Sequence, residues 1–219
     1  GNDEWLWRPL DNSKHLRISS FLDNNPKGFG LLQRDREARN YLDFEANYQD
    51  RPSAWVEPLS DWGKGLVQLV EIPSLQEIHD NIVAYWVPEE EIKANHEYKF
   101  AYRLIWLNDV MKDKELVSIM ATRTGIGGVS GINTNNTDRK FVIDFSGKIL
   151  DEKFAEKGIS PEVSAIKGKI NGVSSVYNPI TKGVTVYVDY QPVDGDEIRV
   201  VLKQEGKAIS EVWSYQWLN

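Results

Sequence analysis

Apolar and polar residues alternate in short stretches along most of the chain. Alternation over about four to eight residues is typical of a β-strand with one buried face, and it is clear in LRISSF (16–21), EYKFAYRLIWL (97–107) and GVTVYVDYQP (183–192). GLVQLVEIP (65–73) is rich in β-branched residues, and NIVAYWVP (81–88) is almost wholly apolar, which predicts a central strand. Stretches rich in Gly, Pro, Asn and Asp separate these segments, as turns do. The pattern predicts an all-β protein.

One segment fits two patterns. REARNYLDFEANYQ (36–49) has a composition that a helix would tolerate, but its apolar positions do not share one helical face. Within it, YLDFEANY alternates. We therefore predict a strand from Tyr41 to Tyr48.

The polar stretch NDVMKDKEL (108–116) divides the chain into two β-rich units. After it come VSIMATRT and a loop rich in Gly, Ser, Asn and Thr. Six short strands are then predicted: RKFVIDFSG, VSAIKGKING, VSSVYNPI, GVTVYVDYQP, EIRVVLKQEG and AISEVWSYQW. This many short strands in about a hundred residues is typical of an immunoglobulin-like β-sandwich, here without its cysteine pair. We predict one unit at 1–111 and the immunoglobulin-like unit at 112–219.

Composition and charge exclude several classes of function. Hydrophobic residues make up 41% of the chain and charged residues 27%, which is enough for a buried core. The net charge of −7 argues against a non-specific nucleic-acid binder, which needs a basic surface. Cysteine is absent, and His15, His79 and His96 lack the spacing of a zinc site, so we expect no metal site and no cofactor. No apolar run reaches the ~18 residues of a membrane helix.

Acidic and aromatic residues are interleaved between Phe29 and Pro88. Seven Asp and Glu residues precede Gly63, and Glu77 and Asp80 follow it. The aromatic residues of this stretch include Tyr41, Tyr48, Trp55, Trp62, Tyr85 and Trp86. Carboxylates accept hydrogen bonds from several hydroxyls, and aromatic faces cover the apolar side of a sugar ring. The stretch therefore suits a carbohydrate, although an ordinary polar sheet surface would have the same composition.

Several motifs recur in the order in which a known family carries them. FGLLQRDR, YLDFEANYQDRPSAWVEP, WGKG, VQLVEIP, DNIVAYWVP and the closing SEVWSYQW resemble the C-terminal half of the periplasmic glucan biosynthesis proteins G and D. The resemblance spans almost the whole chain, while proteins of that family are much longer. The chain also begins at Gly1 instead of Met and shows no signal peptide, so we expect a processed or truncated protein.

The resemblance implies a fold and a function. The fold is the C-terminal part of a galactose-mutarotase-like β-supersandwich, followed by an immunoglobulin-like β-sandwich, in a protein of the Gram-negative periplasm. The function that the resemblance implies is a role in the synthesis of osmoregulated periplasmic glucans. In that role the protein would be an inverting endo-β-1,2-glucanase that acts on the linear glucan backbone. The alternative is a non-catalytic glucan-binding or scaffold protein that assists a membrane glucosyltransferase. A third interpretation, a sugar mutarotase, rests on fold analogy alone.

The same resemblance raises an expectation about partners. A chain without the front of the first domain would expose sheet edges and apolar faces. We therefore expect a homodimer, or association with the missing N-terminal part, besides the β-1,2-glucan itself. We expect no nucleic acid.

Inverting hydrolysis needs two carboxyl groups, one to protonate the leaving oxygen and one to activate water. Asp80 is the candidate acid, because it directly precedes an apolar strand and matches the position that the resemblance implies; Glu77 is its candidate helper. Asp80 and Asn81 could instead only cap a turn. Asp35 is the rival, as a base or a sugar-binding group, although the surrounding arginines also suit a structural ion-pair network. The general base is also sought upstream of this chain.

The candidates for substrate binding are Gln33, Arg36, Tyr48, Trp55, Glu57, Trp62 and Arg123. We assign Trp55 and Trp62 to the surface, because tryptophans beside Gly and Pro in loops often form exposed platforms. Trp86 and Trp106, inside apolar strands, are assigned to the core. The loop 125–136 corresponds to the family region that is expected to order over bound glucan. Arg123, at the base of this loop, is predicted to reach either sugar hydroxyls or Asp138.

Overall fold

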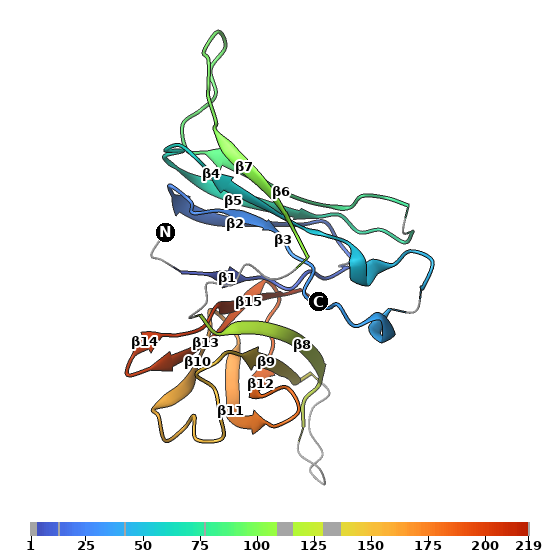
Figure 1. Cartoon of the computed structure of the whole chain (residues 1–219), viewed down its shortest axis with the longest axis vertical. Coiled ribbons are helices and arrows are strands. Elements are labelled where there is room, and N and C mark those ends of the chain that lie inside the picture. Colours follow the sequence, from blue (N-terminus) through green and yellow to red (C-terminus); the bar gives the residue numbers. More distant parts are fainter. Residues whose placement is uncertain are drawn as a thin grey trace. The chain divides into compact units, whose positions relative to one another are not determined.

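The computed structural model describes residues 4–12, 14–41, 43–76, 78–108, 116–128 and 137–218. Strands dominate them, which confirms the prediction of an all-β protein. The chain divides into two compact units, which are seen in Figure 1. Unit 1 contains residues 10–111, and unit 2 joins residues 4–9 to residues 112–219.

Unit 1 contains two antiparallel three-stranded sheets, with the strand orders β2-β5-β6 and β3-β4-β7. Its elements are β2 (Arg17–Asn24), β3 (Phe29–Leu31), the 3-10 helices η1 (Ala38–Asn40) and η2 (Tyr48–Asp50), β4 (Ser53–Pro58), β5 (Lys64–Glu71), β6 (Ile82–Pro88) and β7 (Tyr102–Leu107). Large apolar side chains on its strands remain exposed: Leu22 is 85% and Trp106 is 64% exposed. The sheets of unit 1 therefore present apolar surface that other described residues do not cover.

Unit 2 contains the sheets β1-β15-β13-β10, with β14 paired to β13, and β11-β12-β9-β8. Its strands are β1 (Leu6–Trp7), β8 (Ser118–Ile126), β9 (Arg139–Ser146), β10 (Ile159–Ala165), β11 (Lys169–Asn178), β12 (Gly183–Gln191), β13 (Asp196–Gln204), β14 (Lys207–Ala208) and β15 (Val212–Trp217). Alternate residues of β9, β12 and β13 are fully buried in one core cluster that joins both sheets. Burying one aliphatic side chain contributes about 1.5–3 kcal/mol, so this sandwich-like core is the main source of stability in unit 2.

Asp196 organises one corner of unit 2, at the start of β13. Its carboxylate is fully buried. Oδ1 accepts hydrogen bonds from the backbone N–H groups of Ile166 (3.0 Å), Lys167 (2.7 Å) and Glu197 (2.9 Å). Oδ2 accepts hydrogen bonds from the N–H of Gly168 (2.7 Å) and the hydroxyl of Tyr190 (2.6 Å). One carboxylate thus fixes the β10–β11 turn, the end of β12 and the start of β13.

The strand β1 belongs to unit 2 although it precedes unit 1 in the chain. Leu6 and Trp7 pair in parallel with Val212 and Trp213 of β15, and the backbone N–H of Val212 donates to the Trp5 carbonyl (2.7 Å). Unit 1 is therefore inserted in the sequence between the first strand of unit 2 and the rest of that unit. The predicted boundary, by contrast, assigned all of 1–111 to the first unit.

The predicted strand from Tyr41 to Tyr48 is wrong. The described residues of this segment form turns, and η2 begins at Tyr48. The carboxylate of Asp43 accepts hydrogen bonds from the N–H groups of Glu45 (2.8 Å) and Ala46 (3.1 Å), and Asn47 adopts the left-handed conformation (φ 48°). Such side chain to backbone hydrogen bonds compete with a strand ladder, and the alternation of residue types could not reveal them.

Two further strand predictions need correction. The apolar strand β6 lies at an edge of its three-stranded sheet and β5 lies at the centre. In unit 2, Asn171 and Gly172 do not separate two strands: β11 runs through them, with a register shift between Ile170 and Gly172. Glycine within a strand often marks such a bulge, so the Asn-Gly pair here signals an irregularity and not a turn.

Lys182 provides a first prediction, about stability. It precedes β12 with a left-handed backbone (φ 52°), a conformation that costs a residue with a Cβ about 1–2 kcal/mol. Glycine avoids that cost but loses about 0.5–1 kcal/mol through greater unfolded-state entropy. Lys182→Gly is therefore expected to raise the free energy of unfolding by about 0.5–1 kcal/mol, measured by urea denaturation. Lys182→Ala keeps the Cβ and is the control; an equal gain in both variants would contradict the argument.

Candidate functional site

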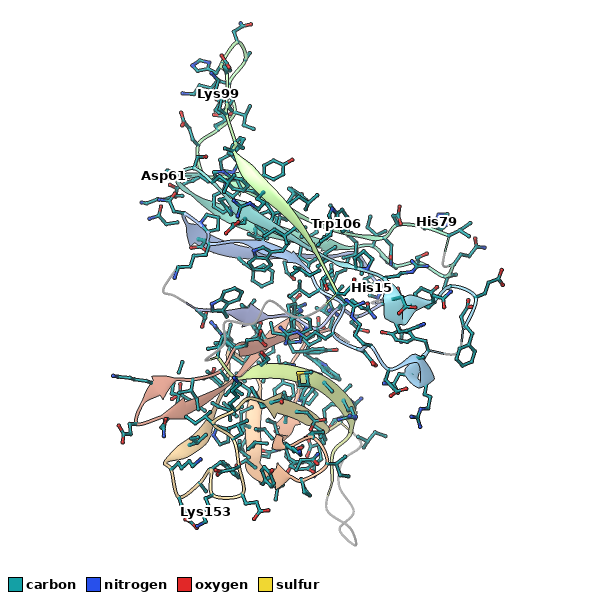
Figure 2. All side chains as sticks on the ribbon, viewed as in Figure 1. His15, Asp61, His79, Lys99, Trp106 and Lys153 are labelled. Carbon is teal, nitrogen blue, oxygen red and sulfur yellow. The ribbon has the colours of Figure 1, made fainter. Side chains whose placement is uncertain are left out.

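Two of the predicted site residues of unit 1 lie at opposite ends of β5. Trp62 lies in the turn before this strand, and Asp80 lies in the loop after it. Figure 2 shows their neighbours Asp61 and His79 at opposite ends of the unit. The eight residues of β5 span about 25 Å. One sugar ring cannot contact both residues, whereas an extended oligosaccharide spans such a distance.

Asp80 is exposed on the loop between β5 and β6. The base of this loop is closed by Asn81, whose Nδ2 donates to the Ile72 carbonyl (2.8 Å) and whose carbonyl accepts from the Ile72 N–H (2.8 Å). Within the loop, the Ser74 hydroxyl donates to the Gln76 carbonyl (2.6 Å). The carboxyl group of Asp80 is therefore presented to solvent from a loop with a fixed base.

Asp35 and Gln33 lie in one hydrogen-bonded cluster before η1. The Asp35 carboxylate accepts hydrogen bonds from the Glu37 N–H (3.0 Å) and from Asn40 Nδ2 (2.8 Å). Its backbone carbonyl accepts from Gln33 Nε2 and from the Tyr41 hydroxyl, both at 2.9 Å, and Gln33 Nε2 also bonds to that hydroxyl. Amide and N–H donors thus orient the exposed Asp35 carboxylate.

Arg36 fastens the loop that carries Asp35 to the start of β4. One terminal nitrogen of its guanidinium donates to the carbonyl of Gln49 (2.9 Å) and to that of Arg51, and the other donates to the Ser53 hydroxyl (3.4 Å). The Arg51 guanidinium in turn lies over the Tyr48 ring, 4.4 Å from its centroid. Arg36 and Tyr48 are therefore brought together, but both are engaged in holding the loop.

Trp62 is the centre of an aromatic cluster. It is partly buried, and its Nε1 donates to the Ala101 carbonyl (3.2 Å). Its centroid lies 5.5–6.4 Å from those of four rings, which are Phe29, Trp86, Phe100 and Tyr102. Edge-to-face contacts at such distances stabilise aromatic clusters. The predicted surface position of Trp62 holds only in part, because the neighbouring rings cover part of its side chain.

The exposures of two other tryptophans are the reverse of those predicted. Trp55 is 8% exposed and Trp106 is 64% exposed. The Trp55 ring lies so close to Gly28 that a Cβ there would come within 2.5 Å of it. Trp55 pairs with Ile105 and Ala54 pairs with Trp106, so the two tryptophans lie on opposite faces of the β4–β7 pair. Trp55 therefore offers little surface to a sugar, and Trp106 is not a core residue.

Glu57 lies two residues after Trp55, on the same face of β4. Its carboxylate forms an ion pair with Arg103 of β7 (2.8 Å). The two residues are direct partners in the antiparallel ladder. Glu57 is partly exposed, so its carboxylate can accept hydrogen bonds from sugar hydroxyls in place of the Arg103 guanidinium.

Arg123 lies in unit 2, on β8. It is well exposed, and its guanidinium forms an ion pair with the buried Asp144 carboxylate (2.6 Å). The other oxygen of Asp144 accepts the Thr185 hydroxyl (2.6 Å). The predicted pairing with Asp138 is therefore wrong: Arg123 pairs with an acid of the neighbouring strand β9.

Two predicted features lie outside the described residues. Glu77 is one of them. The greater part of the loop 125–136, from residue 129 onward, is the other.

A buried charged pair at the end of β5, where the Asp80 loop begins, was not predicted from the sequence. Arg17 and Glu71, direct partners in the β2–β5 ladder, are 4% and 2% exposed, and their charged groups lie 3.7 Å apart. Asp11 joins them: its carboxylate lies 3.8 Å from the Arg17 guanidinium, and its N–H donates to Glu71 Oε1 (3.2 Å). An acid within the apolar stretch GLVQLVEIP was the signal that could have revealed this pair.

Unit 2 also carries a shallow hollow of about 280 Å³ on the outer face of β13. Two ion pairs line it, Arg199 with Glu4 and Lys203 with Glu162. Its lining lacks aromatic side chains. A sugar ring would therefore find no apolar platform there.

Among the described residues, no three His, Asp or Glu side chains converge in a way that would hold a metal ion. No helix in the described part of the chain is long and apolar enough to cross a membrane.

Comparisons with known proteins agree with the motifs. The family model of the periplasmic glucan biosynthesis protein MdoG matches residues 1–217. The chain is 40% identical to the "probable glucans biosynthesis protein D" of Shewanella oneidensis and 43% identical to the "glucans biosynthesis protein G" of Rhodopseudomonas palustris. Each alignment covers 99% of this chain but only 41% and 42% of these relatives. A match of this extent shows that the chain belongs to the family of periplasmic glucan biosynthesis proteins.

Proposed function

We propose that the chain is part of a periplasmic inverting endo-β-1,2-glucanase that shortens the linear backbone of osmoregulated periplasmic glucans. The observation that carries the proposal is the exposed Asp80 carboxyl, presented from a loop with a closed base in a chain of this family. As the general acid, Asp80 would protonate the glycosidic oxygen as the bond breaks.

The second carboxylate of the proposed reaction must activate water on the opposite face of the sugar. Asp35 is the candidate within this chain, since two donors orient its carboxylate and leave it exposed. A residue outside residues 1–219 is the other candidate. Glu57 and Trp62 extend the proposed binding surface along β4 and toward the other end of β5.

The alternative is a glucan-binding scaffold that assists a membrane glucosyltransferase. Unit 2 supports it by its strand order: apart from β1, which is added at the edge beside β15, the sheets β8-β9-β12-β11 and β10-β13-β15 follow the order expected of an immunoglobulin-like constant-type sandwich. Such sandwiches often recognise other proteins through their edges and loops. The uncovered apolar face of unit 1 supports a further part of the proposal, in which this face packs against additional polypeptide, either a second copy or a preceding part of the same protein.

Product analysis tests the enzyme proposal. The protein, as its organism makes it, is expected to release new reducing ends from linear β-1,2-glucan, and NMR during the first minutes should show the α-anomer, because a single displacement inverts the centre. A linear β-1,3-glucan is the control substrate. Initial β-anomer would contradict the inverting mechanism. Tight binding of the glucan with no new reducing ends would favour the scaffold instead.

A further inference from the structure

The loop that carries Asp80 is held at a second point, away from its base. Asn12 Nδ2 donates to the Ser74 carbonyl (3.0 Å), and Asn12 Oδ1 accepts the Ser74 N–H (3.4 Å). One amide side chain thus contacts both backbone groups of a single loop residue. Two antiparallel bonds of this kind fix the orientation of the peptide as well as its position.

The position of Asn12 is itself set by the buried pair beneath it. The preceding residue, Asp11, is bonded through its backbone N–H to Glu71 and through its carboxylate to Arg17. Because Arg17 and Glu71 are almost fully buried, displacing either would leave a charge without its partner in the interior, which is strongly unfavourable. The ion pair thus anchors the segment 11–12 to the end of β5.

The two attachments hold both described arms of the loop. Asn81 ties the end of the loop to Ile72, and Asn12 ties Ser74 to a segment about sixty residues earlier in the sequence. Asp80 directly precedes Asn81, so its backbone has little freedom at that end. Ser74 fixes the opposite arm of the loop, from which the chain returns to Asp80.

We propose that Asn12 is a positioning residue for Asp80, with the Arg17–Glu71 pair as its anchor. This inference rests on the proposed function, because positioning has a catalytic meaning only if Asp80 is the general acid. A misplacement of about 1 Å can reduce catalysis about 10²-fold. Loss of the two Asn12 hydrogen bonds is therefore expected to lower kcat. The KM for glucan is expected to stay unchanged, because the residues along β4 that are proposed to bind the glucan are not altered.

The test compares Asn12→Ala with Asn178→Ala in the protein as its organism makes it. Asn178 is a matched control in unit 2, where its Oδ1 accepts the N–H groups of Ile180 (3.0 Å) and Thr181 (3.3 Å) in the β11–β12 turn. Asn12→Ala is expected to lower kcat on β-1,2-glucan about 10-fold or more, with KM within about twofold. Asn178→Ala is expected to leave both constants unchanged.

Three readouts separate positioning from a general loss of structure. Hydrogen exchange of the Ser74 amide should accelerate in Asn12→Ala and not in Asn178→Ala. The dependence of kcat/KM on pH should keep its shape in Asn12→Ala, because the proposed acid Asp80 is retained. Asn12→Asp keeps an acceptor for the Ser74 N–H but turns a carboxylate oxygen toward the Ser74 carbonyl, so it is expected to lower kcat as Asn12→Ala does. Glu71→Gln is avoided, because it would leave the Arg17 charge buried and unfold the sheet.

The outcomes distinguish this inference from the proposed function. An active wild-type protein with unchanged kcat in Asn12→Ala, despite faster exchange at Ser74, overturns the positioning role alone. An equal loss of kcat in Asn178→Ala also overturns it, because the effect would then follow from stability. A wild-type protein that leaves β-1,2-glucan intact overturns the proposed function, and the positioning role with it.

Discussion

The Asp80→Asn variant is expected to hydrolyse β-1,2-glucan about 10²- to 10⁴-fold more slowly than the wild-type protein, the range by which a positioned acid accelerates such a step. Asparagine has nearly the same shape as aspartate but carries no proton that the leaving oxygen can take. Because Asp80 is exposed and its loop is closed by Asn81, the substitution should leave the fold and the affinity for glucan intact. The measurement is kcat from reducing ends, together with the dissociation constant for the glucan.

Asp151→Asn is the control for this variant. Asp151 is an exposed turn residue of unit 2, and its carboxylate pairs with Lys157 (2.6 Å). The same chemical change there should leave turnover unchanged. Wild-type turnover in Asp80→Asn would exclude Asp80 as the general acid and direct the search to Asp35 or to residues outside this chain. Loss of both turnover and glucan affinity would instead assign Asp80 to substrate binding.

The second large effect concerns stability. Asp196→Asn is expected to lower the free energy of unfolding of unit 2 by about 3 kcal/mol or more, because each hydrogen bond to a buried charge contributes about 1.5–3 kcal/mol. The Asp196 carboxylate accepts five hydrogen bonds in a fully buried corner. An asparagine amide keeps one of the two oxygens. Its NH₂ group would face either the N–H of Gly168 or the N–H groups that donate to Oδ1, and donors cannot pair with donors. Urea denaturation followed by tryptophan fluorescence measures the loss.

The effect of this variant should depend on pH. Burial alone would raise the pKa of Asp196, but the Tyr190 hydroxyl and the N–H groups of Gly168, Lys167 and Glu197 outweigh it and hold the pKa below its usual value. A lowered folded-state pKa contributes stability that is complete above the unfolded value of about 3.9 and is lost as the pH falls through the folded value. The difference between wild type and Asp196→Asn should therefore shrink between about pH 5 and pH 3. An equal difference at both pH values would contradict this account.

The same corner responds at alkaline pH. Burial, and then the hydrogen bond to Asp196, raise the pKa of the Tyr190 hydroxyl above its ordinary value. A raised tyrosine pKa stabilises the folded state below about pH 10, and that contribution is lost as the pH rises further.

Asp151→Asn is the control for the acid response of Asp196→Asn. The pKa of Asp151 is also lowered, chiefly by its hydrogen bond to Lys157, but the exposed position of Asp151 makes the effect on the free energy of unfolding far smaller.

The sequence predicted the parts of the fold in which a strand has one face buried in a closed core. β9, β12 and β13 alternate because Phe141, Val186 and Val200 all face the interior of unit 2. Alternation failed between Tyr41 and Tyr48, where Asp43 and Asn47 bond to the local backbone instead. Residue types that alternate do not report such bonds.

The site was less accessible from the sequence than the fold. Motif resemblance singled out Asp80 and Asp35, but the burial of Trp55 depends on the space left by Gly28, and the exposure of Trp106 depends on the face of β7 on which it lies. Both are tertiary properties. Asn12 shows no local signal at all, because its partner Ser74 lies on a different strand connection.

The inserted position of unit 1 affects the order in which the protein assembles during synthesis. Residues 4–9 leave the ribosome before unit 1 and before the other strands of unit 2, yet their partner β15 is the last described strand to be made. All of unit 1 must emerge, and all the other strands of unit 2 must follow, before the first strand can pair. Closing so long a loop is entropically slow. β1 therefore stays unpaired until late in biogenesis, and an unpaired strand is prone to join a neighbouring chain.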